Sequence, residues 1–233
     1  MRRPVSAFAA CAVIAVGALI SGCTNTVHGA AVKPASVVPA DDVPPLKESA
    51  LDDLMLSNSE LNAIAGMELA SFYTTDEMND NAHLVSDIDC LGAIYPGEDA
   101  VYDGSGWSAV RDELLLEAGG EADSHLVEQT LILFDSPDEA VEFFETSREK
   151  WRECEQATDI EVDEGAWLPA QVADVDERTI ALKAQVGGTL EGTCQHAMGV
   201  VSNLIVEGLS CDADDNDDAQ KLTSRILEQA AER

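Results

Sequence analysis

The sequence predicts an α+β domain in which an antiparallel sheet has its helices packed on one side and two disulfides join the parts. Three observations lead to this expectation. Apolar and polar residues alternate in several segments between residues 107 and 210, which is typical of half-buried strands. Residues 137–154 and the C-terminal segment have helical periodicity instead. An even number of cysteines remains once the N-terminal leader is set aside.

The leader, residues 1–22, has the outline of a lipoprotein signal peptide. Arg2 and Arg3 precede an uncharged apolar run that is shorter than the roughly 20 residues a membrane-spanning helix needs. Ile20-Ser21-Gly22-Cys23 then resembles the lipobox of bacterial lipoproteins. We therefore expect cleavage before Cys23 and lipidation of its side chain with acyl chains such as palmitate, since one chain alone holds a protein only marginally on a membrane. An ordinary secretory signal that happens to contain a cysteine is the alternative.

Residues 23–47 predict a tether between the lipid and the domain. They hold four prolines and show no apolar period. At about 3 Å per residue in a polyproline-like state, the tether would place the domain roughly 50–70 Å from the membrane. The predicted localisation is the cell membrane, lipid-anchored and facing the extracytoplasmic side, with residues 48–233 as one folded domain.

The charge of the chain excludes some partners. The formal net charge is −32 at pH 7, and only 5% of the residues are aromatic. So acidic a chain is a poor partner for nucleic acid or for an anionic lipid surface. We interpret the excess of carboxylates as solvation of the surface.

The cysteines predict two disulfides. Cys11 leaves with the signal and Cys23 takes the lipid, so four cysteines remain: Cys90, Cys154, Cys194 and Cys211. Outside the cytosol such a set implies disulfides, with three possible pairings. Metal binding is the rival interpretation, but the chain has no Cys-x-x-Cys spacing, and we expect no metal.

One hairpin favours one of the three pairings. Two apolar runs meet at Ser202-Asn203, and a turn there would place Cys194 directly opposite Cys211. A turn shifted toward Gly199 would break this match. In the favoured register Cys90 is left to pair with Cys154. The lengths of the closed loops then suggest stabilisation of roughly 3 kcal/mol for the hairpin bridge and 4 kcal/mol for the other.

The N-terminal third of the domain predicts two short helices and a loop. Ser57 and Glu60 form a capping-box pattern and Gly66 supplies a stop, so a helix is expected over 58–65. Residues 74–87 are polar and predict a loop. A second short helix is expected over 90–94, before Pro96-Gly97.

A hairpin and the longest helix follow. Residues 107–117 and 124–134 alternate around Gly119-Gly120 and predict two paired strands. Ser136 caps a helix over 137–154 that has Pro137 in its first turn. The buried stripe of this helix is expected to be Ala140, Phe144, Ser147, Trp151 and Cys154.

The C-terminal third predicts strands and one helix. The strands are expected near 166–168, 170–175, 179–186, 193–201 and 204–210. Asp217 is expected to cap the last helix with Gln220 as its capping-box partner. The predicted inner face of that helix is Ala219, Leu222, Ile226 and Ala230.

No residue set has a catalytic or metal-binding signature, so we expect no enzyme activity and no cofactor. Ser105 lacks the Gly-x-Ser-x-Gly spacing of a nucleophile elbow, and no His-Glu-x-x-His joins two histidines. In the acidic run that begins at Asp212, residues Asp212, Asp214 and Asn216 occupy alternate positions, as the oxygen ligands of an EF-hand calcium loop do. It lacks the glycine and the final glutamate of that loop, and acidic capping of the last helix explains it better.

The order of these parts resembles the PknH-like extracellular sensor domain family. The segments that carry the resemblance are "GSGW", "SPDEAVEFFETSREKWREC" and "CQHAMGVVSNLIVEGLSC", and it covers about residues 50–231. Its most specific elements are the Trp-x-x-Cys that ends the central helix and the Cys-bounded segment that contains Asn203. This family occurs outside certain mycobacterial transmembrane serine/threonine kinases and as free-standing lipoproteins. The resemblance implies two disulfides in sequence order and a cleft that binds a ligand. Because the chain lacks the His-Arg-Asp and Asp-Phe-Gly motifs of kinases, we expect no phosphoryl transfer.

Five residues are candidates for that ligand cleft. They are Trp107, Arg111, Trp167, His196 and Asn203. The two tryptophans are aromatic side chains at strand edges, and Arg111 is a rare cation on a strand. His196 stands two residues after a cysteine, and Asn203 lies in the Cys-bounded segment. The alternatives are core packing for the two tryptophans, a surface ion pair for Arg111 and a half-buried, hydrogen-bonded position for His196.

The sequence thus predicts a cell-envelope lipoprotein whose extracellular sensor-like domain binds an unidentified small molecule or protein without catalysis. Its membrane contact would run through the lipid on Cys23, and no nucleic acid would bind. The alternatives are a hydrolase acting on envelope material and a structural spacer without a ligand.

Overall fold

The computed structural model describes residues 43–119, 125–158, 160–163, 165–187 and 192–233. All of these residues belong to one compact unit, which spans Val37–Arg233. The predicted signal peptide, Cys23 and most of the predicted tether lie outside the described residues. Near the start of this unit, Val43 is buried and contributes to the core.

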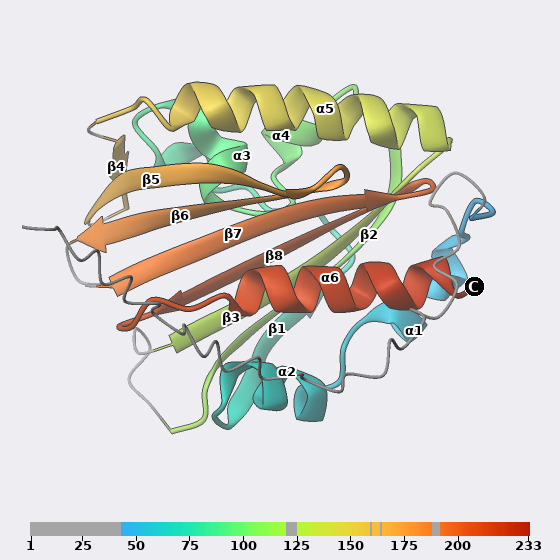
Figure 1. Ribbon diagram of the computed structural model, residues 1–233, viewed down its shortest axis with the longest axis horizontal. Helices are drawn as coiled ribbons and strands as arrows, with labels where there is room; N and C mark the ends of the chain where they lie inside the picture. The colour runs from blue at the N-terminus through green and yellow to red at the C-terminus, as the bar shows by residue number, and fades with distance from the viewer. Residues whose placement is uncertain (1–42, 120–124, 159, 164, 188–191) are drawn as a thin grey trace, which may run out of the picture. The chain divides into compact units, whose positions relative to one another are not determined.

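The unit is built on one antiparallel sheet of eight strands in the order β1-β2-β3-β8-β7-β6-β5-β4 (Figure 1). The strands are β1 (Leu69–Thr75), β2 (Trp107–Glu117), β3 (His125–Phe134), β4 (Ile160–Val162), β5 (Gly165–Asp176), β6 (Thr179–Gly187), β7 (Gly192–Val201) and β8 (Leu204–Asp212). The central position of β8 comes from its hairpin with β7 and its long pairing with β3.

Two long helices and several short ones accompany the sheet. The helices are α1 (Leu51–Leu54), α2 (Asn58–Ala65), α3 (Leu91–Ile94), α4 (Asp99–Tyr102), α5 (Pro137–Cys154) and α6 (Asp218–Ala231). Three 3-10 turns complete the set: η2 (Glu48–Ala50), η3 (Ala82–Leu84) and η4 (Ile88–Cys90). The predicted α+β class, with an antiparallel sheet and two disulfides, is confirmed.

The placement of the helices differs in one respect from the prediction of a single covered side. On β8, Ile205 belongs to the core under α5, whereas its neighbour Val206 belongs to the core under α6. Successive residues of a strand point to opposite faces, so α5 and α6 lie on opposite faces of the sheet (Figure 1). The central strands are therefore buried on both sides. We call the two sides the α5 face and the α6 face.

Strand boundaries differ from the sequence prediction at the two edges of the sheet. The edge strands β1 and β4 and the short helix α4 were not predicted, and β5 is one strand rather than two. Its register shifts between Pro169 and Gln171, a bulge that accommodates the proline. β1 was missed because its exposed outer edge contains Ser and Thr, which weaken the apolar alternation.

Helix caps follow local sequence at α2 and α5 but not at α6. The Ser57–Glu60 capping box forms, and Ser136 accepts a hydrogen bond from the backbone of Glu139. Asp217 makes no capping bond, because its carboxylate pairs with Lys183 at 2.9 Å, which lowers the pKa of Asp217. The predicted Asp217–Gln220 box is therefore wrong.

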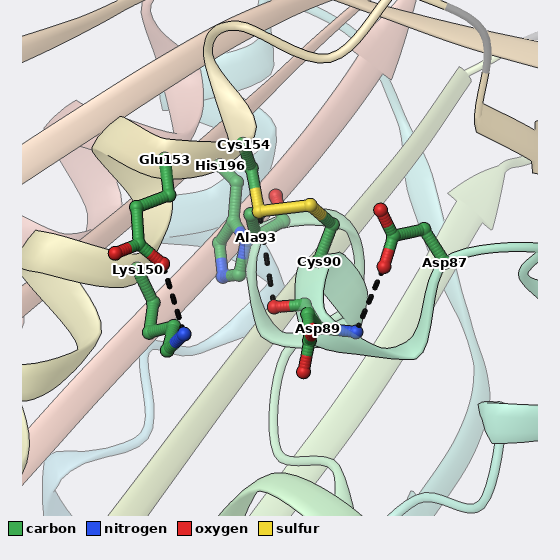
Figure 2. The surroundings of a disulfide bond; sticks show 8 residues. All are labelled: Asp87, Asp89, Cys90, Ala93, Lys150, Glu153, Cys154 and His196. Carbon is green, nitrogen blue, oxygen red and sulfur yellow. Dashed lines mark hydrogen bonds and ion pairs between the residues drawn. A yellow bond between two sulfur atoms is a disulfide. The ribbon is translucent and has the colours of Figure 1, made fainter.

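Both disulfides form in the predicted pairing. Cys194 and Cys211 lie directly opposite each other on β7 and β8, with a Cα–Cα distance of 4.0 Å, because the turn falls at Ser202-Asn203. Cys90 joins Cys154 at a Cα–Cα distance of 5.6 Å and ties η4 and α3 to the end of α5 (Figure 2).

Candidate functional site

A row of carboxyl side chains is buried under the α5 face. Asp112 on β2, Glu128 on β3 and Glu207 on β8 are each at most 6% exposed. Thr130 pairs with both Asp112 and Glu207 across the strands, which places the three acids in one band across the sheet. We call these three acids the carboxyl row. Carboxylates are rarely buried without partners, so the contacts of each decide what the row does.

The Asp112–Glu128 end of the row brings two buried carboxyl groups together. Tyr73 and Asn79 donate to Glu128 Oε1 at 3.0 and 3.2 Å, and Thr130 donates to Asp112. Burial raises the pKa of Asp112 to about 6, and burial with the charge of Asp112 raises the pKa of Glu128 well above its usual range. Asp112 Oδ2 is buried and has no hydrogen-bond partner. The raised pKa values favour a protonated Glu128 beside the Asp112 carboxylate.

This pair predicts that the domain is more stable in mild acid. Both pKa values are higher in the folded domain than in the unfolded chain, so the unfolded chain binds fewer protons above about pH 4. The free energy of unfolding should therefore fall as the pH rises from about 4 past about 6. In Glu128→Gln the amide donates to Asp112 permanently, so we expect this variant to be more stable than the wild type by roughly 1–2 kcal/mol at pH 7.5.

Urea unfolding at pH 5 and pH 7.5 measures this effect. The control is Glu149→Gln, which removes a carboxylate from an exposed position of α5. A Glu128→Gln variant that is less stable at pH 7.5, or that keeps the full pH dependence of the wild type, would contradict the raised pKa values of this pair.

The Glu207 end of the row holds a polar clamp. Tyr102 donates to Glu207 Oε1 at 2.5 Å, and the backbone N–H of Gly97 reaches the same oxygen at 3.3 Å. His196 Nε2 lies 2.9 Å from Glu207 Oε2 but off the line of a hydrogen bond. The ring donates from Nδ1 to the carbonyl of Ala93 at 3.2 Å, since a carbonyl can only accept. These contacts hold the segment 93–102 against the sheet.

A groove lies on the outer side of that clamp, between α5 and the segment 89–105. Its cavity volume is about 500 Å³. Phe143 and Trp151 form its base, and the Trp151 ring packs against His196 at 4.4 Å between centroids. Four carboxylates and one cation line it: Asp89, Asp103, Glu139, Glu142 and Lys150. We call this hollow the α5 groove. Its cation, Lys150, pairs with Glu153 at 2.8 Å (Figure 2).

A second hollow lies at the other end of the α5 face. It has a volume of about 140 Å³, and its walls include Tyr95, Val162, Trp167, Val186 and the Cys194–Cys211 disulfide. We call it the apolar pocket. It shares no lining residue with the α5 groove.

The five predicted cleft residues do not converge on either hollow. Trp167 lines the apolar pocket, and His196 lies in the clamp beneath the α5 groove. Trp107 packs at the edge of the core, and Arg111 pairs with Glu48 and Asp52. The acids and Lys150 of the α5 groove were not predicted, because outward positions of a helix carry no pattern that marks a site.

Asn203 has a structural role in the turn between β7 and β8. It is 4% exposed, and its amide donates to the carbonyls of Phe134 and Leu46 at 2.9 and 3.2 Å. Its oxygen accepts from the backbone N–H of Leu46 at 2.7 Å. Asn203 therefore fastens the end of the predicted tether to the sheet.

A serine, a histidine and an aspartate meet on the α6 face, so the hydrolase alternative needs a direct answer. His125 lies 3.4 Å from Ser210 Oγ and 3.4 Å from Asp212 Oδ2. However, Ser210 is 0% and His125 2% exposed, and neither lines the two hollows described above. A nucleophile needs a substrate in reach. The contact therefore supports packing at the sheet end rather than hydrolysis.

Within the described part of the chain, no three side chains among His, Cys, Asp and Glu are grouped so that they could hold a metal ion. Nor is any helix of that part long and apolar enough to cross a membrane.

Comparison with known proteins matches most of the chain to one family. The model of the PknH-like extracellular domain matches residues 46–229. The serine/threonine-protein kinase PknH of Mycobacterium tuberculosis (strain ATCC 25618 / H37Rv) is 30% identical over 203 residues, which are 85% of this chain and 32% of the kinase. PknH of Mycobacterium bovis is 29% identical, over 82% of this chain and 32% of the kinase. The chain thus spans about a third of the length of these relatives.

The fold agrees with a solved relative. The crystal structure of the extracellular domain of PknH from Mycobacterium tuberculosis superposes with a TM-score of 0.75 at 28% identity. The match covers 82% of this chain and 100% of that one.

Proposed function

Because the chain belongs to the PknH-like extracellular domain family, we propose that it is a non-catalytic lipoprotein of the cell envelope whose domain binds an extracytoplasmic ligand in the α5 groove. The family places such domains outside the cell, and the lipobox ending at Cys23 supports the lipid anchor. The observation that carries the binding role is the groove itself. Its volume of about 500 Å³ is within the range of small-molecule sites, roughly 300–1,000 Å³.

The walls of the α5 groove are fixed in place before any ligand arrives. One wall is the segment 89–105 and the other is α5, and the Cys90–Cys154 disulfide joins them at one end. The bond from His196 to Ala93 and the clamp at Glu207 hold the first wall to the sheet. A preformed site spends little binding free energy on ordering its walls, which favours affinity.

The charges of the groove favour a neutral or cationic ligand. Four carboxylates line it, and its one cation, Lys150, is already paired with Glu153. An anion would meet the repulsion of these carboxylates, whereas an amine over Phe143 or Trp151 would gain from both the charges and the ring faces.

Two substitutions on one helix test the site. Thr146 lines the groove and is exposed, so Thr146→Trp should fill it, whereas Glu149→Trp adds the same ring at an exposed position outside it. We expect envelope amines and other metabolites that raise the melting temperature of the wild type to do so in Glu149→Trp but not in Thr146→Trp. A ligand that stabilises all three proteins equally binds elsewhere. Failure of every envelope fraction to stabilise the wild type would refute the binding role.

The anchor has a separate test. We expect mass analysis of the protein purified from membranes to show a mature chain that begins at a diacylated Cys23. Cys23→Ser should move the protein out of the membrane fraction. An unmodified Cys23 in the native protein would contradict the anchor and leave the groove untouched.

A further inference from the structure

We propose that the apolar pocket is a second binding site, separate from the α5 groove, and that it takes one uncharged aromatic ring. The pocket lies where β3, β5, β6, β7 and β8 meet the end of α3, and nothing in the proposed function uses it. In a chain with a net charge of −32, a hollow with mainly apolar walls differs from the acidic character of most of the surface.

The chemistry of the walls selects the ligand. Leucine, isoleucine and valine side chains line the pocket together with Tyr95, Trp167 and the sulfurs of the Cys194–Cys211 bridge. Aromatic rings pack favourably against other rings in offset or edge-to-face geometry, and sulfur makes favourable contacts with ring edges. Asp163 is the charged residue of the lining, and its carboxylate disfavours an anionic ring.

The volume of the pocket limits the ligand to a single ring. It is about 140 Å³. An apolar protein cavity of about 150 Å³ stays dry and binds benzene. An extended acyl chain or a fused ring system would exceed this volume, so we expect selection by size as well as by polarity.

The fold prevents the walls from closing over the empty space. The sheet wall is held by the ladders between β6, β7 and β8 and by the Cys194–Cys211 bridge. The opposite wall, Ile94 and Tyr95, ends a helix that Cys90 fastens to α5. Gly165 and Gly187 add no side chains to the lining. An apolar hollow that cannot collapse lowers stability in proportion to its volume, because the side chains of its walls lack van der Waals contacts on that side. A ring that fills the hollow restores these contacts.

The test uses toluene with the full mature chain, its disulfides intact. Val186 lines the pocket and is only partly buried, so Val186→Phe should fill the space with a tethered ring. Val141 on α5 is also partly buried at the core but lies outside the pocket, so Val141→Phe is the matched control. We expect toluene to raise the melting temperature of the wild type and of Val141→Phe. Its dissociation constant should rise about tenfold or more in Val186→Phe.

A second variant keeps the test decisive if Val186→Phe fails to fold. Val186→Ala enlarges the pocket, so it should gain binding of naphthalene, which the wild type should reject. Benzoate should bind neither protein. The absence of any toluene effect on the wild type, or an equal effect in Val186→Phe, would overturn the proposal. Thr146→Trp should keep toluene binding, so failure of this site and failure of the α5 groove are distinguishable.

Discussion

Replacing Glu207 by alanine should lower the free energy of unfolding by about 3–5 kcal/mol, because it removes one partner from a buried polar clamp. Glu207 is 1% exposed and accepts from Tyr102 and Gly97, while His196 Nε2 lies 2.9 Å from its other oxygen. Alanine leaves the Tyr102 hydroxyl and the Gly97 N–H buried without an acceptor, and their desolvation is then no longer compensated by a hydrogen bond.

Urea unfolding of Glu207→Ala beside Glu207→Gln separates the clamp from simple loss of volume. Glutamine keeps the shape of the side chain and an oxygen for the Tyr102 hydroxyl. Glu207→Gln should therefore lose clearly less stability than Glu207→Ala. Glu149→Ala, at an exposed position of α5, should change stability by less than about 0.5 kcal/mol. A Glu207→Ala domain as stable as the Glu149→Ala control would show that the clamp contributes nothing.

The clamp matters for binding because it fixes a segment whose residues line both hollows. Its partners come from the segment 93–102, in which Ala93 and Val101 line the α5 groove and Tyr95 lines the apolar pocket. The ring of Tyr102 also stacks on Phe143 at 4.2 Å, which links the clamp to α5. Glu207→Ala should therefore weaken ligands of both hollows, whereas Thr146→Trp and Val186→Phe should each affect one.

Local patterns in the sequence predicted the parts of the fold that depend on local contacts. The hairpin of β7 and β8 was predicted because its turn fixes which residues face each other, and Cys194 and Cys211 then coincide. The helix α5 was predicted because its cap and its buried stripe lie within one segment: Ala140, Phe144, Ser147, Trp151 and Cys154 are all buried.

The carboxyl row was not predicted, for a physical reason. In a sheet covered on one side, polar residues at alternate positions point to water. A prediction of that kind therefore expects Asp112, Glu128 and Glu207 to face solvent. Here helices and loops cover both faces, and these acids point into the domain toward partners distant in sequence. Tyr73 and Glu128, for example, are 55 residues apart. No local pattern encodes such a pair.

The role of Asn203 illustrates the same limit. Its sequence context suggested a ligand cleft, but its partners, Leu46 and Phe134, are 157 and 69 residues away. A polar residue at a turn can serve either purpose, and only the position of distant backbone groups decides between them.

Removing the Cys90–Cys154 disulfide should cost more stability than removing the Cys194–Cys211 disulfide. The first closes a loop with a sequence separation of 64 residues and the second one of 17. By loop entropy alone, Cys90→Ala/Cys154→Ala should lower the free energy of unfolding by about 4 kcal/mol and Cys194→Ala/Cys211→Ala by about 3 kcal/mol. Double variants are needed because a single one leaves a reactive thiol.

The two bridges also differ in what they hold. Cys194–Cys211 joins strands that the hairpin ladder already pairs, whereas Cys90–Cys154 joins α5 to a segment that packs against it through side chains alone, without a backbone ladder. Loss of the Cys90–Cys154 bridge should therefore weaken ligands of the α5 groove as well as the fold, and loss of the other bridge should leave the groove intact. Urea unfolding and groove-ligand titration of the two double variants measure both effects. A larger loss of stability or of groove affinity in Cys194→Ala/Cys211→Ala would contradict this division, because it would place the tie between the groove walls in the sheet rather than in the bridge at the end of α5.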